Sequence, residues 1–406
     1  MPLFYLIFAL PFNFNLLFRA WEQRKLGDHA KYRRGSFPQP YGNKEWYDGE
    51  GAMPFVQVVD VTSKLTLVEN TKQKISKLAQ PKSVFVPKGK VIVTLQGSIG
   101  RIAITQYDSF VDRTLLIFDD YEKETDERFW AYTIQKKFEI EKLKAPGGTI
   151  KTITKEALSS FDVHLPQFEE QQKIGILFKQ LDDTIALHQR KLEALKLMKK
   201  GLLQQMFPKR GENIPKIRLD DFDDIWEQRI LGECLKESKI KGSNGSLAKK
   251  LTVKLWRKGV VPKVEIYTGS SATQYYIRKT GQFMYGKLDF LNQAFGIVPL
   301  ELDGYESTLD SPAFDIEESI NETFLLEYVS LGRFYKYQGN IANGSRRAKR
   351  IHTDTFFEMP IPLPNSNEQQ KIGTFSQQID DLIALQQNKL EKLSSLKRIY
   401  LKNMFI

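Results

Sequence analysis

The sequence is poor in cysteine and histidine, and this scarcity excludes several classes of protein. One cysteine, Cys234, occurs among 406 residues, so the chain can form no internal disulfide and no cysteine-based zinc or iron–sulfur centre. The four histidines are scattered without metal-ligand spacing, and we expect no metal site. The length suits two or three domains, each large enough for an ordinary hydrophobic core.

Long apolar runs are also scarce. The first 18 residues carry no charge, but prolines and asparagines interrupt them, and they lack the basic region and cleavage site of a secretory signal. We treat residues 1–18 as an apolar leader, either exposed or read from a displaced start, to which we assign no role. The alternative is a membrane-tethered coiled-coil scaffold. We expect a cytoplasmic protein without a membrane partner.

Catalytic motifs are missing as well. Residues 281–287 have the spacing of a phosphate-binding loop, but Leu288 stands where Ser or Thr would hold magnesium. There is no nucleophile elbow, no HExxH motif and no dinucleotide glycine motif. We therefore expect no catalytic residue, which argues against the alternative of a self-contained methyltransferase or restriction enzyme.

The composition favours a folded protein with a polyanionic partner. Lys and Arg number 60 against 49 Asp and Glu, which leaves a net charge of +11. This excess suits a nucleic acid, while the even mixing of both signs does not indicate a disordered basic tail. The aromatic content of 12% argues for packed domains.

An internal repeat dominates the chain. Residues 165–207 align without gaps on residues 363–405, with 23 identities in 43 positions. A second echo lies upstream, where WEQRKLGD at 21–28 recurs as WEQRILGE at 226–233. The stretches between these blocks show no comparable match, so two similar frames carry two different inserts.

Each constant block predicts a long helix with a heptad seam. Mostly apolar residues follow a strict 4-3 spacing, which is typical of a coiled coil. The polar residues at these positions are His188, Lys199, Ser376, Gln386 and Lys397. The helix over 169–205 would be about 55 Å long. We predict that the two helices pair antiparallel within one chain, the alternative being that each packs on its own domain. The predicted spacer core consists of Ile174, Leu181, Ile185, Leu192, Leu195, Ile372, Ile379, Ile383, Leu390 and Leu393.

Polar features of the constant blocks support the same helices. Asn365, with Glu368 three residues later, resembles a capping box at the start of the second helix. The doublets at 182–183 and 380–381 are both Asp-Asp, and adjacent helical residues diverge by about 100° and cannot chelate a metal together. We interpret both doublets as a solvated or inter-subunit face.

The inserts read as compact domains rich in strands. Segments such as 84–97, 101–107, 114–120, 281–291 and 295–302 are short, rich in Val, Ile, Phe and Tyr, and bounded by Gly or Pro. We therefore predict an α+β fold with two globular β-rich domains joined by the two long helices in a pseudo-two-fold arrangement. The predicted parts are the leader 1–18, domain 19–164, helix 165–210, domain 211–362 and helix 363–406.

Basic and amide side chains occur where turns would present them to a nucleic acid. Lys and Arg neutralise phosphates, whereas Arg, Gln and Asn in loops can also contact base edges. The alternative for any single residue is a solvated surface charge. The DNA-binding candidates are Lys31, Arg33, Arg34, Gln96, Ser98, Arg101, Thr149, Lys151, Lys250, Lys254, Arg257, Lys287, Asn343, Ser345, Arg346, Arg347, Lys349 and Arg350.

The doubled blocks give the chain a family resemblance. LPxxxEQQKIG followed by the DD and KLE blocks occurs twice, each time with an upstream WEQRxLG, and this pattern resembles the DNA specificity subunit of type I restriction-modification systems. The resemblance extends from about Trp21 to the C-terminus. It implies two target recognition domains, each reading one half of a split asymmetric DNA site, and two helices that fix the spacer.

The resemblance also implies the partners. The subunit would be non-catalytic and would assemble with two methylation and two restriction subunits. The methylation subunits would bind S-adenosylmethionine and methylate adenine at N6. The restriction subunits would use ATP and magnesium for site-specific deoxyribonuclease activity. The exterior of the long helices would dock the methylation subunits.

Overall fold

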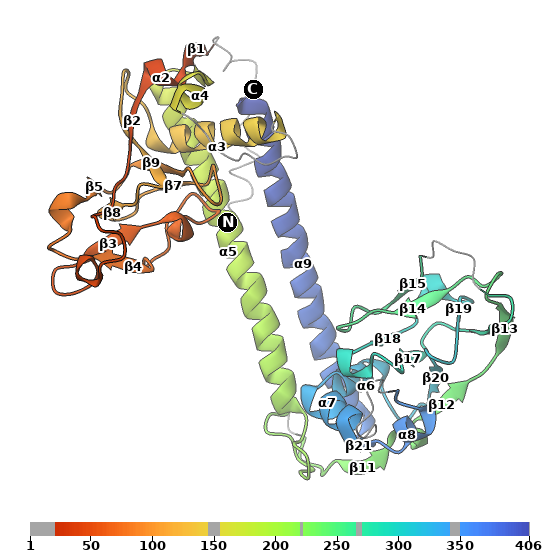
Figure 1. The fold of residues 1–406 in the computed structure, drawn as a ribbon. Coiled ribbons are helices and arrows are strands. Elements are labelled where there is room, and N and C mark those ends of the chain that lie inside the picture. The colour runs from red at the N-terminus through yellow and green to blue at the C-terminus, as the bar shows by residue number, and fades with distance from the viewer. Residues whose placement is uncertain (1–20, 145–154, 220–221, 265–269, 342–349, 406) are drawn as a thin grey trace. The chain divides into compact units, whose positions relative to one another are not determined.

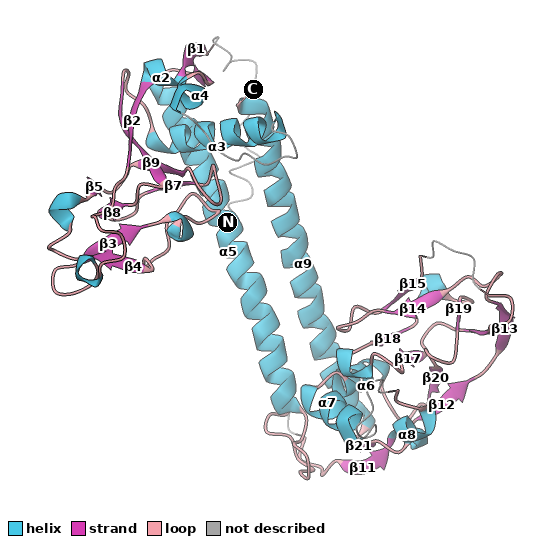
Figure 2. Ribbon diagram, viewed as in Figure 1, coloured by secondary structure: helices cyan, strands magenta, loops and turns pink. Residues whose placement is uncertain are grey.

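The computed structural model describes residues 21–144, 155–219, 222–264, 270–341 and 350–405. The chain forms two compact units: unit 1 is Met1–His188 with Lys389–Ile406, and unit 2 is Gln189–Asn388. Two long helices, α5 (Phe168–Met206) and α9 (Ser366–Met404), each contribute to both units. Both units combine helices with short strands, so the predicted α+β class is confirmed (Figure 2). No described helix has an apolar stretch long enough to cross a bilayer.

Unit 1 is built on two four-stranded sheets, of orders β2-β9-β6-β7 and β4-β3-β8-β5 (Figure 1). Successive side chains of a strand point to opposite faces, so in β6 Ile92 enters a core contributed by both sheets. Val91 and Val93 enter a second core, shared with helices. The strands are β1 (Glu22–Lys25), β2 (Ala30–Arg34), β3 (Met53–Val56), β4 (Gln73–Ile75), β5 (Val84–Val86), β6 (Val91–Thr94), β7 (Ile102–Ile104), β8 (Ser109–Val111), β9 (Leu115–Tyr121) and β10 (Asp162–Leu165).

The helical core of unit 1 includes parts of both long helices. Phe129 of α3 (Glu127–Lys144) and Phe178 of α5 both contact Phe405, with ring centroids 5.5 and 5.7 Å apart. Further along α5, Asp182 pairs with Lys397 of α9 at 2.5 Å. As the residue number rises along α5, the number of its contact residue near the end of the chain falls, so α5 and α9 are antiparallel in this unit. The shorter helices are α2 (Leu26–His29) and α4 (Lys155–Ser159).

Unit 2 repeats this design with different strands. Its main sheet has the order β12-β20-β17-β18, and in β17 Phe283 and Tyr285 face the helical core whereas Met284 faces the opposite one. A three-stranded sheet, β13-β16-β19, and a hairpin, β14-β15, complete the unit (Figure 1). The strands are β11 (Glu227–Ile230), β12 (Leu235–Ser238), β13 (Lys241–Asn244), β14 (Leu251–Val253), β15 (Val260–Pro262), β16 (Gln274–Ile277), β17 (Phe283–Tyr285), β18 (Phe295–Ile297), β19 (Glu306–Ser307), β20 (Ala313–Ile316) and β21 (Pro360–Leu363).

The long helices are antiparallel in unit 2 as well. Lys199 of α5 pairs with Asp380 of α9 at 2.6 Å, and Leu203 and Met206 share a core with Ile372. The guanidinium of Arg333 donates to the carbonyls of Gln204 and Phe207, which satisfies two acceptors at the end of α5. The other helices are α6 (Glu322–Val329), α7 (Gly332–Ile341) and α8 (Thr353–Phe357).

The predicted helix seam is confirmed. The helix expected over 169–205 begins and ends one residue beyond these bounds. Each of the ten predicted core residues is buried or half-buried, and none is exposed. In each unit the seam packs against the other helix, and its ends also enter the core of the β-rich domain.

Candidate nucleic-acid interface

The first predicted basic group lies on an edge strand of unit 1. Lys31, Arg33 and Arg34 all belong to β2, whose neighbour β9 carries two exposed carboxylates. Arg33 donates to Asp119 at 2.8 Å, and Lys31 lies 3.5 Å from Asp120. Arg34 is exposed and forms no ion pair with any residue that the structure describes. Of the three cations, Arg34 therefore has the least internal competition for a phosphate.

The predicted glycine-flanked loop joins two paired strands. Gln96, Ser98 and Arg101 connect β6 to β7, which are antiparallel neighbours, and Gln96 and Arg101 are exposed. Gly100 has a φ of +80°, and a Cβ atom there would approach the ring of Phe138 to 2.6 Å, so the turn requires glycine. The loop thus has a fixed backbone and two exposed polar side chains.

The predicted cations of unit 2 have more internal roles. Lys250 is buried, with its ammonium 5.5 Å from the Tyr275 ring, and burial lowers the pKa of the half-buried Lys287. Arg350 pairs with Asp310 at 2.9 Å. Lys254 is exposed next to the β14-β15 turn. DNA contacts by these residues stay a prediction.

Arg257 has a structural partner that the sequence did not indicate. Both of its terminal guanidinium nitrogens donate to Glu327, a carboxylate that is 1% exposed. Our sequence analysis counted Arg257 as an available cation, whereas the structure shows it holding the β14-β15 turn to α6. The remaining candidates, Thr149, Lys151, Asn343, Ser345, Arg346, Arg347 and Lys349, lie outside the described residues.

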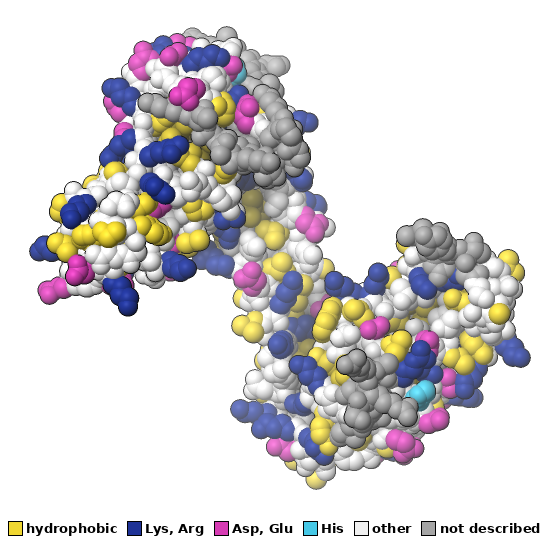
Figure 3. Space-filling view, viewed as in Figure 1, with side chains coloured by type: hydrophobic (Ala, Val, Ile, Leu, Met, Phe, Trp, Pro, Cys, Tyr) yellow, Lys and Arg dark blue, Asp and Glu magenta, His cyan; other side chains and the backbone are white. Residues whose placement is uncertain are grey.

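Basic side chains are mixed with other kinds of side chain on the face drawn in Figure 3. Figure 3 shows Lys and Arg scattered among Asp, Glu and apolar side chains on the visible face. No group of three or more His, Cys, Asp or Glu side chains among the described residues is arranged to hold a metal ion. The described candidates thus lie on strand β2 and in several separate loops.

The repeated WEQR and EQQ motifs meet in each unit. The indole of Trp21 donates to Glu170 at 3.2 Å, and the indole of Trp226 donates to Glu368 at 3.1 Å. The strands that follow the two tryptophans pair with the strands that precede the long helices, β1 with β10 and β11 with β21. Each long helix is thereby attached at its first turn to the strand that opens the domain.

The expected capping box at the start of α9 is half correct. Asn365 accepts from the backbone N–H of Glu368 at 3.0 Å, as an N-cap does. The Glu368 carboxylate, however, accepts from Trp226 and from the guanidinium of Arg218. This bond to Glu368 raises the pKa of Arg218. The glutamate therefore serves tertiary structure rather than the box.

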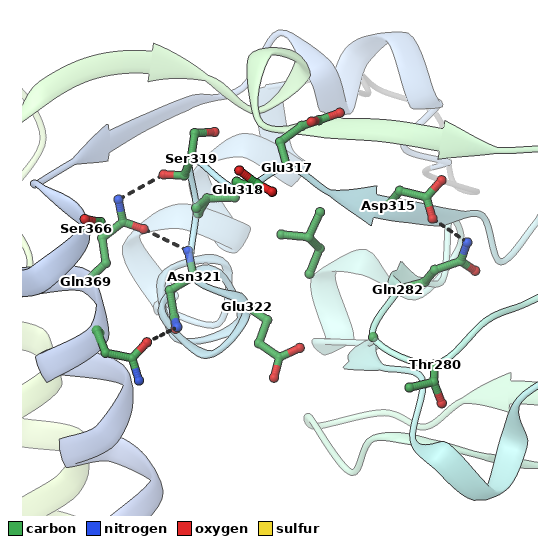
Figure 4. Close-up of a pocket in the computed structure, with 14 residues that line it drawn as sticks. Thr280, Gln282, Asp315, Glu317, Glu318, Ser319, Asn321, Glu322, Ser366 and Gln369 are labelled. Carbon is green, nitrogen blue, oxygen red and sulfur yellow. Dashed lines mark hydrogen bonds between the residues drawn. The ribbon is translucent and has the colours of Figure 1, made fainter.

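The glutamine and glycine of EQQKIG fasten each long helix to the domain beside it. Gln369 accepts from the backbone N–H of Asn321 at 2.9 Å and donates to Ser319 and Pro364 (Figure 4). Asn321 is the N-cap of α6, and a Cβ atom on Gly373 would lie 2.8 Å from its Oδ1. Close approach of the two helices therefore requires glycine.

Unit 1 contains the same attachment. Gln171 accepts from the backbone N–H of Asp126 at 3.1 Å and donates to Pro166. Asp126 caps α3, and a Cβ atom on Gly175 would lie 2.5 Å from its Oδ1. Two unlike domains are thus held by one pattern of polar contacts.

The Asp-Asp doublets were interpreted as a solvated or inter-subunit face, but their first members pair within the chain. Asp182 accepts from Lys397 and from the hydroxyl of Tyr132, at 2.5 and 2.6 Å. Asp380 accepts from Lys199, which also lies 3.1 Å from Glu327. A lysine in each seam is thus paired with the aspartate of the other helix.

Glu327 is the most enclosed charge of this network. It accepts from Arg257 and from the hydroxyl of Ser376 on α9, and Lys199 lies beside it. Burial opposes its ionisation, but Arg257 and Lys199 outweigh burial and hold the pKa of Glu327 below its usual value. The carboxylate therefore joins the β14-β15 turn to both long helices within unit 2.

Sequence reasoning missed these polar contacts, although one signal was available. Trp, Glu, Gln, Gly, Asp and Lys at the junctions are all identical between the two copies, whereas the surrounding inserts differ. When two repeated blocks hold unlike domains, the residues that stay identical between the blocks are those that each domain must contact.

Known proteins resemble this chain over most of its length. A family model described as the type I restriction modification DNA specificity domain matches residues 19–197 and 312–395. The type I restriction enzyme MjaVIII specificity subunit of Methanocaldococcus jannaschii is 22% identical over 395 residues, covering 93% of this chain and 90% of that protein. The putative MjaX specificity subunit of the same organism is 22% identical over 280 residues, covering 61% and 59%.

Two solved structures share the fold. The type I restriction-modification S subunit from M. genitalium matches with a TM-score of 0.59 at 15% identity, covering 95% of this chain and 96% of that one. A chain from work on complex assembly and conformational transition of the type I R-M system also matches with a TM-score of 0.59. It is 17% identical, with coverages of 96% and 98%.

Proposed function

The chain belongs to the type I restriction-modification DNA specificity family, and on that premise we propose that its two recognition domains each read one half of a bipartite, asymmetric DNA site. The observation that carries this proposal is the pair of unlike domains held by like junctions. Trp21–Glu170 and Trp226–Glu368 fasten different inserts to equivalent helix ends. Different loops on equivalent frames would read different base sequences at two places.

The experiment exchanges one insert. Replacing residues 29–164 with the corresponding insert of another family member should change one half of the methylated sequence, and replacing 234–362 should change the other half. The reciprocal exchange is the matched control, because both variants keep the Trp21–Glu170 and Trp226–Glu368 pairs. A change in both halves after one exchange would contradict the proposal.

We further propose that the long helices set the spacer between the half-sites. The Asp182–Lys397 and Lys199–Asp380 pairs flank equal lengths of α5 and α9, so removing residues 188–194 and 386–392 together preserves both pairs. Seven residues correspond to about 10 Å, close to the rise of three base pairs. The spacer should shorten by up to this amount with the half-site sequences unchanged. Removing one heptad alone misaligns the pairs and should destabilise the protein.

The partners complete the proposed function. This chain would contribute recognition only, within a complex that contains two methylation subunits and two restriction subunits. The methylation subunits would bind S-adenosylmethionine and methylate adenine, and the restriction subunits would use ATP and magnesium to cleave DNA. Because the partner is present twice, its docking residues should occur on both long helices.

Exposed residues that are identical in the two copies support such docking. Leu187 and Leu385 are repeat equivalents and are 43% and 49% exposed. Replacing either by Glu should remove one methylation subunit from the complex, measured by native mass spectrometry. Leu197 is 72% exposed but is matched by Ser395, so Leu197→Glu is the control and should leave the stoichiometry unchanged. Full assembly by both test variants would put docking elsewhere.

A further inference from the structure

A cavity of about 800 Å³ in unit 2 is lined by residues of α5, α7 and the β14-β15 turn. Lys196 and Lys200 line it from α5, Lys336 lines it from α7, and Trp256 and Arg257 line it from the turn. None of the three lysines was among the DNA-binding candidates of the sequence analysis. Its lining therefore combines cations from separate elements with an aromatic ring.

The cavity has more positive charge than its own carboxylates neutralise. Its acidic side chains, Glu327 and Asp380, are already paired with Arg257 and Lys199. Lys196, Lys200 and Lys336 form no ion pair with any described residue of the chain. Three ammonium groups that share one cavity repel each other, and an anion bound among them would relieve that repulsion.

The backbone around the cavity is held in a conformation that side chains disfavour. Trp256, Arg257 and Gln293 have φ values of 58°, 54° and 53°, and they are three of the five non-glycine residues with positive φ in the described chain. Residues held in this conformation are strained and concentrate at functional sites. The backbone N–H groups of Trp256 and Arg257 donate to Asn292 and Gln293, so the two turns hold each other.

The consequence of this backbone is an exposed indole beside the lysines. Trp256 is 58% exposed, although its neighbour Arg257 is fixed on the buried Glu327. The other tryptophans at positions 46, 130 and 226 are buried. A large apolar ring held in solvent next to free cations suits a ligand with both an anionic and an apolar part.

We propose that this cavity seats a phosphate of the DNA backbone among Lys196, Lys200 and Lys336, with the Trp256 indole against the adjoining deoxyribose. The proposal rests on the proposed function and extends it, because a phosphate contact reads no sequence but fixes the register of the second recognition domain on the duplex. Lysine ammonium groups suit this task, since they bind phosphate as point charges without a fixed fork geometry.

The test measures DNA affinity against salt concentration, using the chain assembled with its methylation subunits and a duplex that carries the recognised site. Lys196→Gln with Lys200→Gln should reduce the slope of log K against log salt by about 0.9, the value for one phosphate contact. The recognised sequence should not change. Lys209→Gln with Lys216→Gln removes the same charge from exposed lysines outside the cavity and should leave the slope unaltered.

Tryptophan fluorescence gives a second readout. Bound DNA should shield Trp256 from acrylamide, and this DNA-dependent protection should be missing in Trp256→Phe. The wild-type complex could bind its site while the lysine variant keeps the wild-type salt slope and Trp256→Phe keeps the wild-type protection from acrylamide. In that case the cavity does not contact the DNA, and the proposed function stands. Loss of a methylation subunit from the lysine variant would make the cavity a protein contact and would also overturn the proposal. If the wild-type complex selects no sequence, both proposals fail.

Discussion

Replacing Glu327 by Gln tests whether the buried carboxylate holds unit 2 together. Removing one partner of a buried ion pair typically costs 3–5 kcal/mol, because the other charge is left without compensation. Here Lys199 keeps Asp380, and the Arg257 side chain is 24% exposed and can regain water. We therefore expect a loss near the lower bound, about 3 kcal/mol.

Hydrogen exchange of the α6 amides measures this loss in the intact chain. This method is chosen because the chain has two units and need not unfold in a single transition. A cost of 3 kcal/mol corresponds to roughly 150-fold faster exchange. Glu233→Gln is the control, because this exposed carboxylate pairs with an exposed Arg229 and its loss should cost under about 0.5 kcal/mol. An effect of Glu327→Gln below about fivefold would refute the reasoning.

The same variant carries a pH signature. Because the pKa of Glu327 is lowered in the folded protein, its contribution is present above its unfolded pKa, near 4.5, and disappears as the pH falls through the folded value. The difference in exchange between wild type and Glu327→Gln should therefore shrink below pH 4.5. A difference that stayed constant into strong acid would contradict the assigned ionisation.

Two further predictions concern packing and protonation. Gly373→Ala should destabilise unit 2 by about 1–3 kcal/mol, because its Cβ meets the Asn321 side chain. A Cβ atom at Gly201 meets nothing within 4 Å, so Gly201→Ala should stabilise α5 by up to about 1 kcal/mol. Hydrogen exchange of amides in α5 and α6 compares the two variants, and changes of the same sign would contradict the contact at Gly373. Burial, and then the cation of Arg24, lower the pKa of His29. The stability that neutral His29 gives unit 1 is therefore present above pH 6.5 and is lost below it. The free energy of unfolding of unit 1 should fall from pH 7.5 to 5.5. In His29→Phe this pH dependence should be weaker.

The sequence predicted the features that depend on periodicity and missed those that depend on distant pairing. The 4-3 spacing located the seam from Ile174 to Leu393, because burial along a helix follows the residue period. It could not indicate why Lys199 occupies a seam position, since its partners Asp380 and Glu327 lie more than 120 residues away.

The clustering of basic residues in the sequence led to a wrong prediction for Arg257, because its partner lies far away along the chain. Lys254, Arg257 and Lys258 look equivalent in the sequence, yet Arg257 has a buried carboxylate partner 70 residues later, which composition does not reveal. Strand segments such as β6 and β17 were recognisable because both faces of these strands are buried, which requires runs of apolar residues. Contacts between segments, by contrast, are set by the folded arrangement.

Sequencing of methylated adenines in DNA modified by the assembled complex tests the central claim most directly. Two recognition domains of unlike sequence predict two specific blocks of different base sequence, separated by a gap of constant length and arbitrary sequence. A single continuous block, or a palindrome with identical halves, would contradict the account.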